Sequence, residues 1–349
     1  MNFLKYILLP FQLLYSIIIF IRNMLYDYKI LNIYDVNSKI ISIGNMSTGG
    51  TGKTPMVEYI LRLLNNYNVA ILSRGYMRKT RGFIIADDKH KYAHQIGDEN
   101  SQLFNKFQNT LIACDTNRYQ GAKKLIAIKK DLEIIILDDG YQHRSLKRDL
   151  DIVLTEYDNL FIHDSLLPIG SLREQKQEIK RANIIIITKC PQNIPDQKKE
   201  QIYSSLNLRK EQKIFFSYIS SYNFLLMPSR KKYKINLEKK HIIITGIQNP
   251  KTLTNFLENK SINYYHLKFN DHYNFKSNDI SKIIHLKSEL DSSDELLMTE
   301  KDYYRLSNNQ INQLSNHFKL VCIEINTDFI GNDKSDFNNQ LLKFAQSKT

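Results

Sequence analysis

Residues 40–55 read IISIGNMSTGGTGKTP, an apolar run followed by a glycine-rich turn that ends in Gly-Lys-Thr. The apolar run predicts a buried strand, and MVEYILRLL over 56–64 predicts a helix. A glycine-rich turn between a strand and a helix aims several backbone N–H groups at one point beside a helix N-terminus, which suits a polyphosphate. We therefore expect a phosphate-binding loop here.

The residues of this loop have different expected roles. The strict pattern GxxxxGK[ST] has glycine at position 47, where this chain has Ser47, and later glycines supply the flexibility instead. Lys53 is expected to reach the β- and γ-phosphates, and the Thr54 hydroxyl to bind Mg²⁺. The residues expected to hold the nucleotide are Gly49, Gly50, Thr51, Gly52, Lys53, Thr54 and Pro55.

Length and composition narrow the class of protein. The chain has 349 residues, a formal net charge of +13, and three cysteines without metal-ligand spacing. The length suits two domains, and the scattered cysteines suggest reduced thiols of a cytosolic protein. The charge reflects either a Lys-, Asn- and Ile-rich composition or an anionic partner. No RNA-binding or zinc-finger pattern is present, so we expect no nucleic acid and infer no obligate protein partner.

The N-terminal segment is apolar. Residues 3–21 read FLKYILLPFQLLYSIIIFI, and the part after Lys5 has about 16 residues, fewer than the roughly 20 that span a bilayer. No small-residue cleavage site follows. A buried core helix is one interpretation. We favour a helix in the membrane interface, with its tyrosines and the flanking Lys5, Arg22 and Lys29 at headgroup level.

Apolar strands alternate with helical patterns along the rest of the chain, which predicts a parallel α/β sheet covered on both faces. The pattern weakens over 210–240 and restarts with HIIITGIQNP, which a helix from about 251 to 259 follows. Strands are expected at 68–76, 82–87, 110–115, twice within 132–156, at 183–190 and at 213–220, and helices at 94–107 and 117–130. The expected regions are a membrane-interface helix over 1–30, a P-loop NTPase-like kinase domain over 31–230 and a smaller C-terminal α/β domain over 231–349.

Two carboxylates end a hydrophobic strand in EIIILDDG, where ligands bind in open α/β sheets. Asp138 and Asp139 are therefore expected to hold Mg²⁺, although two acids before glycine are also common in solvated turns. Further candidates for the base and the cations of phosphoryl transfer are Asp98, His143, Arg144, Arg173 and His272. The guanine-reading pattern of GTPases is missing from TKCP at 188–191 and from TEKD at 299–302, which leaves ATP as the expected nucleotide.

Several motifs together resemble the tetraacyldisaccharide 4′-kinase family, the lipid A kinases of Gram-negative bacteria. They follow the family's order along almost the whole chain, and Ser47 is normal for that family. Asn100 replaces the proline that usually follows GDE. The matching motifs are GNMSTGGTGKTP (44–55), SRGY (73–76), GDE (97–99), DDGYQHR (138–144), LPIGSLRE (167–174), GIQNP (246–250), FNDHYNF (269–275) and TEKD (299–302).

The resemblance implies an activity and a location. The family transfers the γ-phosphoryl group of ATP to the 4′-hydroxyl of a tetraacylated glucosamine disaccharide 1-phosphate, the lipid A precursor. A lipid acceptor explains the apolar N-terminal helix and part of the positive charge. We expect a peripheral or monotopic protein on the cytoplasmic face of the inner membrane, bound to its lipid surface. The resemblance also adds Glu174 as a possible metal contact, with Arg173 on phosphate.

The acceptor hydroxyl needs a base, and Asp98 is our candidate because it lies in a polar turn at a helix start. The alternative is that Asp98 only caps that helix. His272, from the second domain, is expected to orient Asp98, so closure of the cleft would assemble the pair. With Lys53 and Asp139, these are the expected catalytic residues. Expected acceptor contacts are Asn45, Arg74, Tyr76, Gln142, His143 and Arg173, with Arg78 and Lys79 as further cations near the lipid phosphate.

Two other functions remain open from the sequence. A kinase or ligase for a small soluble substrate on the same fold would leave the N-terminal helix unexplained. A membrane-positioning ATPase that phosphorylates nothing would also fit the phosphate loop. Such an ATPase needs no second domain with an Asp–His pair, and its ATP consumption would not depend on a lipid disaccharide.

Overall fold

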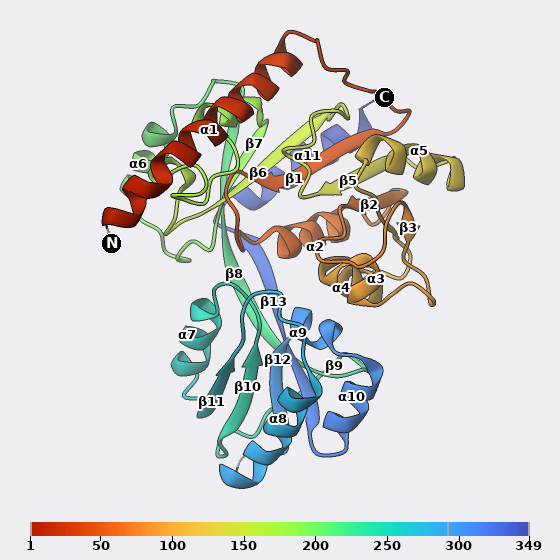
Figure 1. Ribbon diagram of the computed structural model, residues 1–349, viewed down its shortest axis with the longest axis vertical. Coiled ribbons are helices and arrows are strands. Elements are labelled where there is room, and N and C mark those ends of the chain that lie inside the picture. Colours follow the sequence, from red (N-terminus) through yellow and green to blue (C-terminus); the bar gives the residue numbers. More distant parts are fainter. Residues whose placement is uncertain (1, 292, 348–349) are drawn as a thin grey trace.

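The computed structural model describes residues 2–291 and 293–347, and it divides visibly into a larger and a smaller α/β half (Figure 1). One mixed sheet runs through both halves in the order β11-β10-β12-β13-β8-β7-β6-β1-β5-β2-β4-β3, with β9 paired to β8. Most neighbours are parallel, which confirms the predicted fold class. The antiparallel pairs are β8–β13, β3–β4 and β8–β9.

The larger half is built on short apolar strands that are buried on both faces. Along β5, Ile134 and Ile136 pack into one core, while Ile135 and Leu137 pack into the core on the opposite face. This alternation explains why continuous apolar runs form its parallel strands. The parallel strands are β1 (Lys39–Asn45), β2 (Val69–Ser73), β4 (Leu111–Cys114), β5 (Ile134–Asp138), β6 (Leu150–Glu156) and β7 (Ile184–Thr188), while the half-buried β3 (Ile84–Ile85) is antiparallel to β4.

The helices predicted for the larger half are confirmed except over 94–107. The helix expected over 94–107 is two helices, because Gly97 has a φ of 91° and packs against the backbone of Gly75, where a Cβ would lie 3.1 Å from its Cα. The strand expected over 82–87 is only two residues long. The helices are α2 (Lys53–Leu63), α3 (Ala93–Ile96), α4 (Asp98–Lys106), α5 (Arg118–Ile128) and α6 (Asp196–Leu206), with 3₁₀ turns at Phe161–His163 and Lys176–Arg181.

The smaller half repeats the alternation with its own core, and the predicted helix over 251–259 is confirmed as α7. Its strands are β9 (Lys231–Lys232), β10 (His241–Thr245), β11 (Tyr264–Lys268) and β12 (Glu295–Thr299). Its helices are α7 (Lys251–Asn259), α8 (Ser277–Glu289), α9 (Glu300–Arg305) and α10 (Asn308–Ser315).

Two long strands connect the halves (Figure 1). β8 (Lys213–Leu226) pairs with β7 through its first residues and with β13 (Lys319–Phe329) through its later ones. After β13 the chain returns to the larger half, where Phe337 and Leu341 of α11 (Asp333–Gln346) pack in the same core as β1. The three-region division stays a proposal, and this packing argues for assigning the last residues to the larger half.

The N-terminal helix α1 (Asn2–Asp27) lies along the outside of the larger half (Figure 1). Lys5–Asp27 is long and apolar enough to cross a membrane. Its most apolar stretch has a mean hydropathy of 1.7, and only 11% of the residues of that stretch are buried. A buried core helix is therefore not what the structure contains. The exposed apolar side chains of α1 include Ile7, Leu9, Phe11, Leu13, Leu14, Ile17, Ile18, Phe20 and Ile21.

Candidate active site

A cavity of about 930 Å³ lies between the two halves, beside the carboxyl ends of the central strands. The phosphate loop, Asp138 and Asp139 line it from the larger half. Residues 247–249 and 271–272 line it from the smaller half. The register of the sheet explains this position, because β1 and β5 are adjacent and Ile43 pairs with Asp138.

The phosphate loop follows β1 and opens α2 at Lys53. Gly49 and Gly52 have φ angles of 132° and 87°, which favour glycine. A Cβ at 49 would lie 2.9 Å from the amide end of the Gln248 side chain in the smaller half, a contact that a rotation of Gln248 would relieve, so the backbone angle is the stronger reason for glycine. The Asn45 side chain donates to the Thr51 hydroxyl at 2.9 Å and fixes the loop from below. All seven residues predicted to hold the nucleotide line the cavity.

Asp139 is held by two cations on the cavity wall. The guanidinium of Arg173 donates to both of its oxygens at 2.8 Å, and Lys53 Nζ lies 3.5 Å from Oδ1. Burial alone would raise the pKa of Asp139, but the charges of Lys53 and Arg173 hold it well below its usual range. Asp139 is therefore an ionised partner for the cations that face the phosphates.

Asp138 has a different environment. It is only 2% exposed, and its Oδ1 has no hydrogen-bond partner among the described residues. Burial, followed by the nearby charge of Glu99, raises the pKa of Asp138 to about 7. An unpaired buried carboxylate oxygen near Thr54 on the same cavity wall fits a hard cation, since Mg²⁺ takes oxygen ligands from one or two carboxylates and from phosphates.

Asp98 and His272 meet across the two halves. His272 Nδ1 lies 3.0 Å from Asp98 Oδ2, and Arg305 Nε donates to the same oxygen at 3.0 Å. Burial opposes ionisation of Asp98, but the hydrogen bond from His272 and the charges of Lys301 and Arg305 hold its pKa well below the usual range. An ionised Asp98 can only accept, so neutral His272 carries its proton on Nδ1.

His272, not Asp98, faces the cavity. Asp98 is 4% exposed and does not line the cavity, whereas His272 does. The rings of His272 and Tyr76 pack edge to face, with their centroids 5.0 Å apart. Burial lowers the pKa of His272, yet Asp98 and then Asp271 raise it above its ordinary value overall. The pair thus resembles a carboxylate that orients an imidazole, with Nε2 as the atom available for proton transfer.

Helices α4 and α9 hold this pair together through ion pairs between the halves. Glu99 accepts from Lys301 Nζ at 2.9 Å, beside the contact of Asp98 with Arg305. About two turns further along α4, Lys106 Nζ lies 3.1 Å from Glu300. The structure therefore brings Asp98 and His272 together from the two halves, as expected from the sequence, and the role of domain closure stays a prediction.

Comparison with known proteins decides the family. The sequence profile of tetraacyldisaccharide-1-P 4′-kinases (LpxK) matches residues 4–346. The chain belongs to the LpxK family. It is 38% identical to the tetraacyldisaccharide 4′-kinase of Flavobacterium johnsoniae, over 99% of this chain and 98% of that one. The Flavobacterium psychrophilum and Bacteroides fragilis enzymes are 38% and 36% identical over nearly the full chain.

A solved LpxK structure has the same architecture. The crystal structure of LpxK from Aquifex aeolicus in complex with ATP is 28% identical, with a TM-score of 0.75 over 99% of this chain and 100% of that one. The sequence-based resemblance to this family is thus confirmed.

Of the LpxK motif residues expected at the acceptor, most lie on the cavity wall: Arg74, Tyr76, Gln142, His143 and Arg173. Asn45 does not, because it is fully buried beneath the loop. Burial and the charge of Arg118 lower the pKa of His143 to about 3, so His143 is neutral and can accept or donate one hydrogen bond. Arg78 instead donates to Cys114 Sγ and the Gly82 carbonyl.

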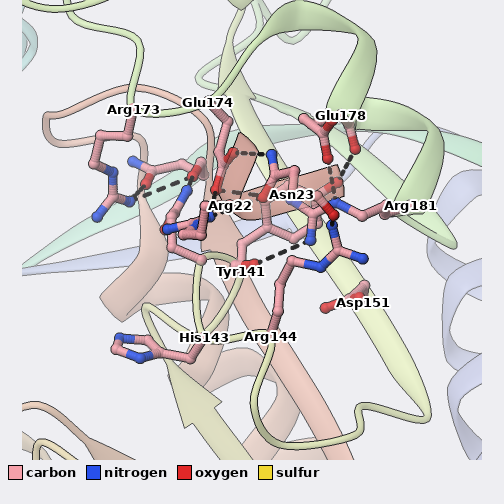
Figure 2. A network of polar contacts seen from close by, with 12 residues as sticks. Arg22, Asn23, Tyr141, His143, Arg144, Asp151, Arg173, Glu174, Glu178 and Arg181 are labelled. Carbon is pink, nitrogen blue, oxygen red and sulfur yellow. Dashed lines mark hydrogen bonds and ion pairs between the residues drawn. The ribbon is translucent and has the colours of Figure 1, made fainter. Parts of the chain in front are cut away.

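Glu174 is not brought to the other metal candidates. Its fully buried carboxylate pairs with Arg22 Nη2 at 2.6 Å and accepts from Asn23 Nδ2 at 2.9 Å (Figure 2). Arg144 likewise turns away from the cavity and donates to the Asn23 carbonyl at 3.2 Å. The structure gives both residues a role in docking α1, because the partners that satisfy them come from that helix.

The sequence analysis missed three residues around the Asp–His pair, namely Glu99, Lys301 and Arg305. Glu99 and Lys301 belong to the motifs GDE and TEKD, and their occurrence together was the available signal. Arg305 lies three residues beyond TEKD, and nothing local in the sequence connects it with Asp98, 207 residues away.

Proposed function

We propose that this chain phosphorylates the 4′-hydroxyl of a tetraacylated glucosamine disaccharide 1-phosphate with ATP, in lipid A biosynthesis. Membership of the LpxK family supports the reaction, and the ATP complex of the Aquifex aeolicus relative supports the nucleotide. The observation that carries the proposal is the cavity itself, because it unites a phosphate loop with an Asp–His pair from both halves.

The phosphate loop and its cations bind and orient the nucleotide. Lys53 stabilises negative charge that develops on the transferred phosphoryl group, and its contact with Asp139 keeps it in place. Thr54 and Asp138 would hold Mg²⁺, with Asp139 as a second carboxylate at the same strand end. When bound, the ion neutralises charge on the β- and γ-phosphates.

The Asp98–His272 pair activates the acceptor. His272 Nε2 accepts the proton of the 4′-hydroxyl as that oxygen bonds to the γ-phosphorus and the bond from phosphorus to the bridging oxygen breaks, so that ADP leaves. Asp98 stabilises the imidazolium that forms. We therefore assign proton acceptance to His272 and orientation to Asp98, the reverse of the assignment from sequence. This assignment of roles rests on Asp98 Oδ2, which already accepts hydrogen bonds from both His272 and Arg305.

The exposed apolar face of α1 supports binding to a membrane, and we propose the cytoplasmic face of the inner membrane as its location. Arg74, Tyr76, Gln142, His143 and Arg173 are the proposed acceptor contacts, since polar and cationic groups suit a sugar 1-phosphate. With one side of α1 docked on the larger half, we favour a monotopic helix in the interface of the inner membrane.

Transfer of ³²P from labelled ATP to the disaccharide 1-phosphate lipid tests the function. We expect a labelled lipid with phosphate at the 4′ position, and His272→Ala should abolish most of the label. ATP hydrolysis that is unchanged by the lipid, without labelled lipid, would instead support the membrane-positioning ATPase.

A further inference from the structure

Segment 171–175 lies between α1 and the phosphate loop and contacts both. On the loop side, Arg173 N donates to the Met46 carbonyl and Thr48 N to the Ser171 carbonyl, both at 2.7 Å. On the helix side, the Tyr15 hydroxyl donates to the Arg173 carbonyl at 3.1 Å. Segment 171–175 therefore links α1 directly to the start of the phosphate loop.

The buried carboxylate of Glu174 makes the contact between segment 171–175 and α1 costly to break. Its side chain is 0% exposed, and its two close partners, Arg22 and Asn23, both belong to α1. Arg181 Nη2 is farther away at 3.8 Å. Without α1, a buried carboxylate would lose its hydrogen bonds, which is among the costliest changes in a protein interior. Segment 171–175 would then have to move so that Glu174 could reach water.

The side chain of Arg173, the residue before Glu174, points to the nucleotide site and not to α1. Its guanidinium donates to both oxygens of Asp139 and to the Asn45 side chain, which itself fixes Thr51 of the phosphate loop. Adjacent side chains are thus fixed to α1 on one side and to the nucleotide site on the other (Figure 2). Misplacement of such a group by about 1 Å can lower a rate about 100-fold.

A second connection runs through the motif DDGYQHR. Arg144 of this motif contacts Asp27 and the Asn23 carbonyl of α1. Two residues earlier, Gln142 Nε2 donates to the Asn45 carbonyl at 2.9 Å beneath the phosphate loop. The connections through Arg173 and through Gln142 therefore both reach Asn45, which lies beneath the phosphate loop.

We propose that α1 is a positioning element of the phosphate site. Its seating through Tyr15, Arg22 and Asn23 sets Arg173 on Asp139, so a helix whose other face is apolar and exposed also controls the turnover rate. Asn23 and Glu174 lie off the cavity wall and act through Arg173, whereas Tyr15 and Arg22 also line the cavity. The inference deepens the proposed function and rests on it for its activity readout.

The first test compares full-length Glu174→Gln with wild type in detergent mixed micelles that contain the lipid acceptor. We expect kcat to fall about tenfold, while the fraction of protein that sediments with phospholipid vesicles is unchanged. The matched control is Asp35→Asn, which removes an exposed ion pair with Lys147 just beyond α1 and should keep the wild-type kcat. A raised KM for the lipid with an unchanged kcat would mean that α1 is only an anchor and would overturn the proposal.

The second test asks whether Glu174 acts through Arg173. In the Arg173→Ala background, Glu174→Gln should lower kcat no further, because the group that it positions is gone. Losses that multiply would show independent roles and would also overturn the proposal. If Glu174→Gln does not fold, Asn23→Ala replaces it, since it removes one of the two close partners of Glu174 without changing the cavity wall, and an approximately threefold lower kcat is expected. Wild-type transfer in the same assay establishes the function separately, so a negative result concerns only the positioning role.

Discussion

Replacing Arg305 with methionine should destabilise the protein strongly and in a pH-dependent manner. Arg305 Nε lies 3.0 Å from Asp98 Oδ2, and its Nη1 lies 3.1 Å from Asp302 Oδ1 and also contacts the Gly246 carbonyl. The side chains of Arg305, Asp98 and Asp302 are 6%, 5% and 0% exposed. Methionine fills a similar volume but leaves two buried carboxylates without their shared cation.

The expected cost follows from this burial. Removing one partner of a buried ion pair costs about 3–5 kcal/mol of unfolding free energy. We expect the lower part of that range, because Asp98 keeps its contact with His272 and the nearby charge of Lys301. The control is Lys334→Met, which breaks a contact with Asp328 that is 52% exposed on the lysine side. That change should cost at most about 1 kcal/mol.

The pH dependence has a definite sign. In the wild type, the pKa of Asp98 lies below its unfolded value of about 3.9, so its contribution to stability is present above that value and is lost as pH falls. Without Arg305 the pKa of Asp98 rises. The difference in unfolding free energy between wild type and variant should therefore narrow as pH falls below about 5. Urea unfolding followed by circular dichroism from pH 7 to pH 4 measures it. A difference that is constant with pH, or an equal cost for Lys334→Met, would refute the reasoning.

Three further predictions concern the reaction. Lys53→Ala should lower kcat at least about 100-fold in the lipid assay, since it removes a cation from the phosphoryl group, and near-normal turnover would contradict the phosphate site. Asp138 must lose its proton to bind Mg²⁺, so the Mg²⁺ concentration for half-maximal activity should rise about tenfold per pH unit below about 7, and Asp138→Asn should remove that dependence. The acidic limb of kcat/KM should have an apparent pKa above 6.5, because His272 must be neutral to accept a proton. Asp271→Asn should move this limb to lower pH, because it removes a negative charge that raises the pKa of His272, and an unmoved limb would argue against His272 as the titrating group.

The features predicted correctly are those with a local cause. The apolar run 134–137 specifies a buried strand by itself, and Gly-Lys-Thr after such a run specifies a phosphate loop. The partners of Glu174 could not be predicted in this way, because Arg22 lies 152 residues earlier in the chain. The resemblance implied a metal contact for Glu174 and a phosphate contact for its neighbour Arg173. Burial of Glu174 against α1 is a tertiary effect without a sequence pattern.

The same distinction explains the split helix and the Asp–His pair. Asp98 looked like a cap or a base from its position at a helix start, and its φ > 0 neighbour Gly97 gave no sign of the close contact with Gly75. Arg305, from the smaller half, donates a hydrogen bond to Asp98, and His272 is the member of the pair that faces the cavity. Only the three-dimensional arrangement therefore distinguishes the orienting group from the accepting one.

The return of α11 to the larger half has a consequence for biosynthesis. The core of that half includes Ile41 and Ile71 near the start of the chain and Phe337 and Leu341 near its end. Phe337 and Leu341 are synthesised after all the strands of that half. The smaller half, which is contiguous between β8 and β13, can therefore acquire its core first, in contrast to the usual order in which N-terminal domains fold earliest. Until α11 has been synthesised and has docked, the apolar face that it covers stays open to chaperones that bind nascent chains.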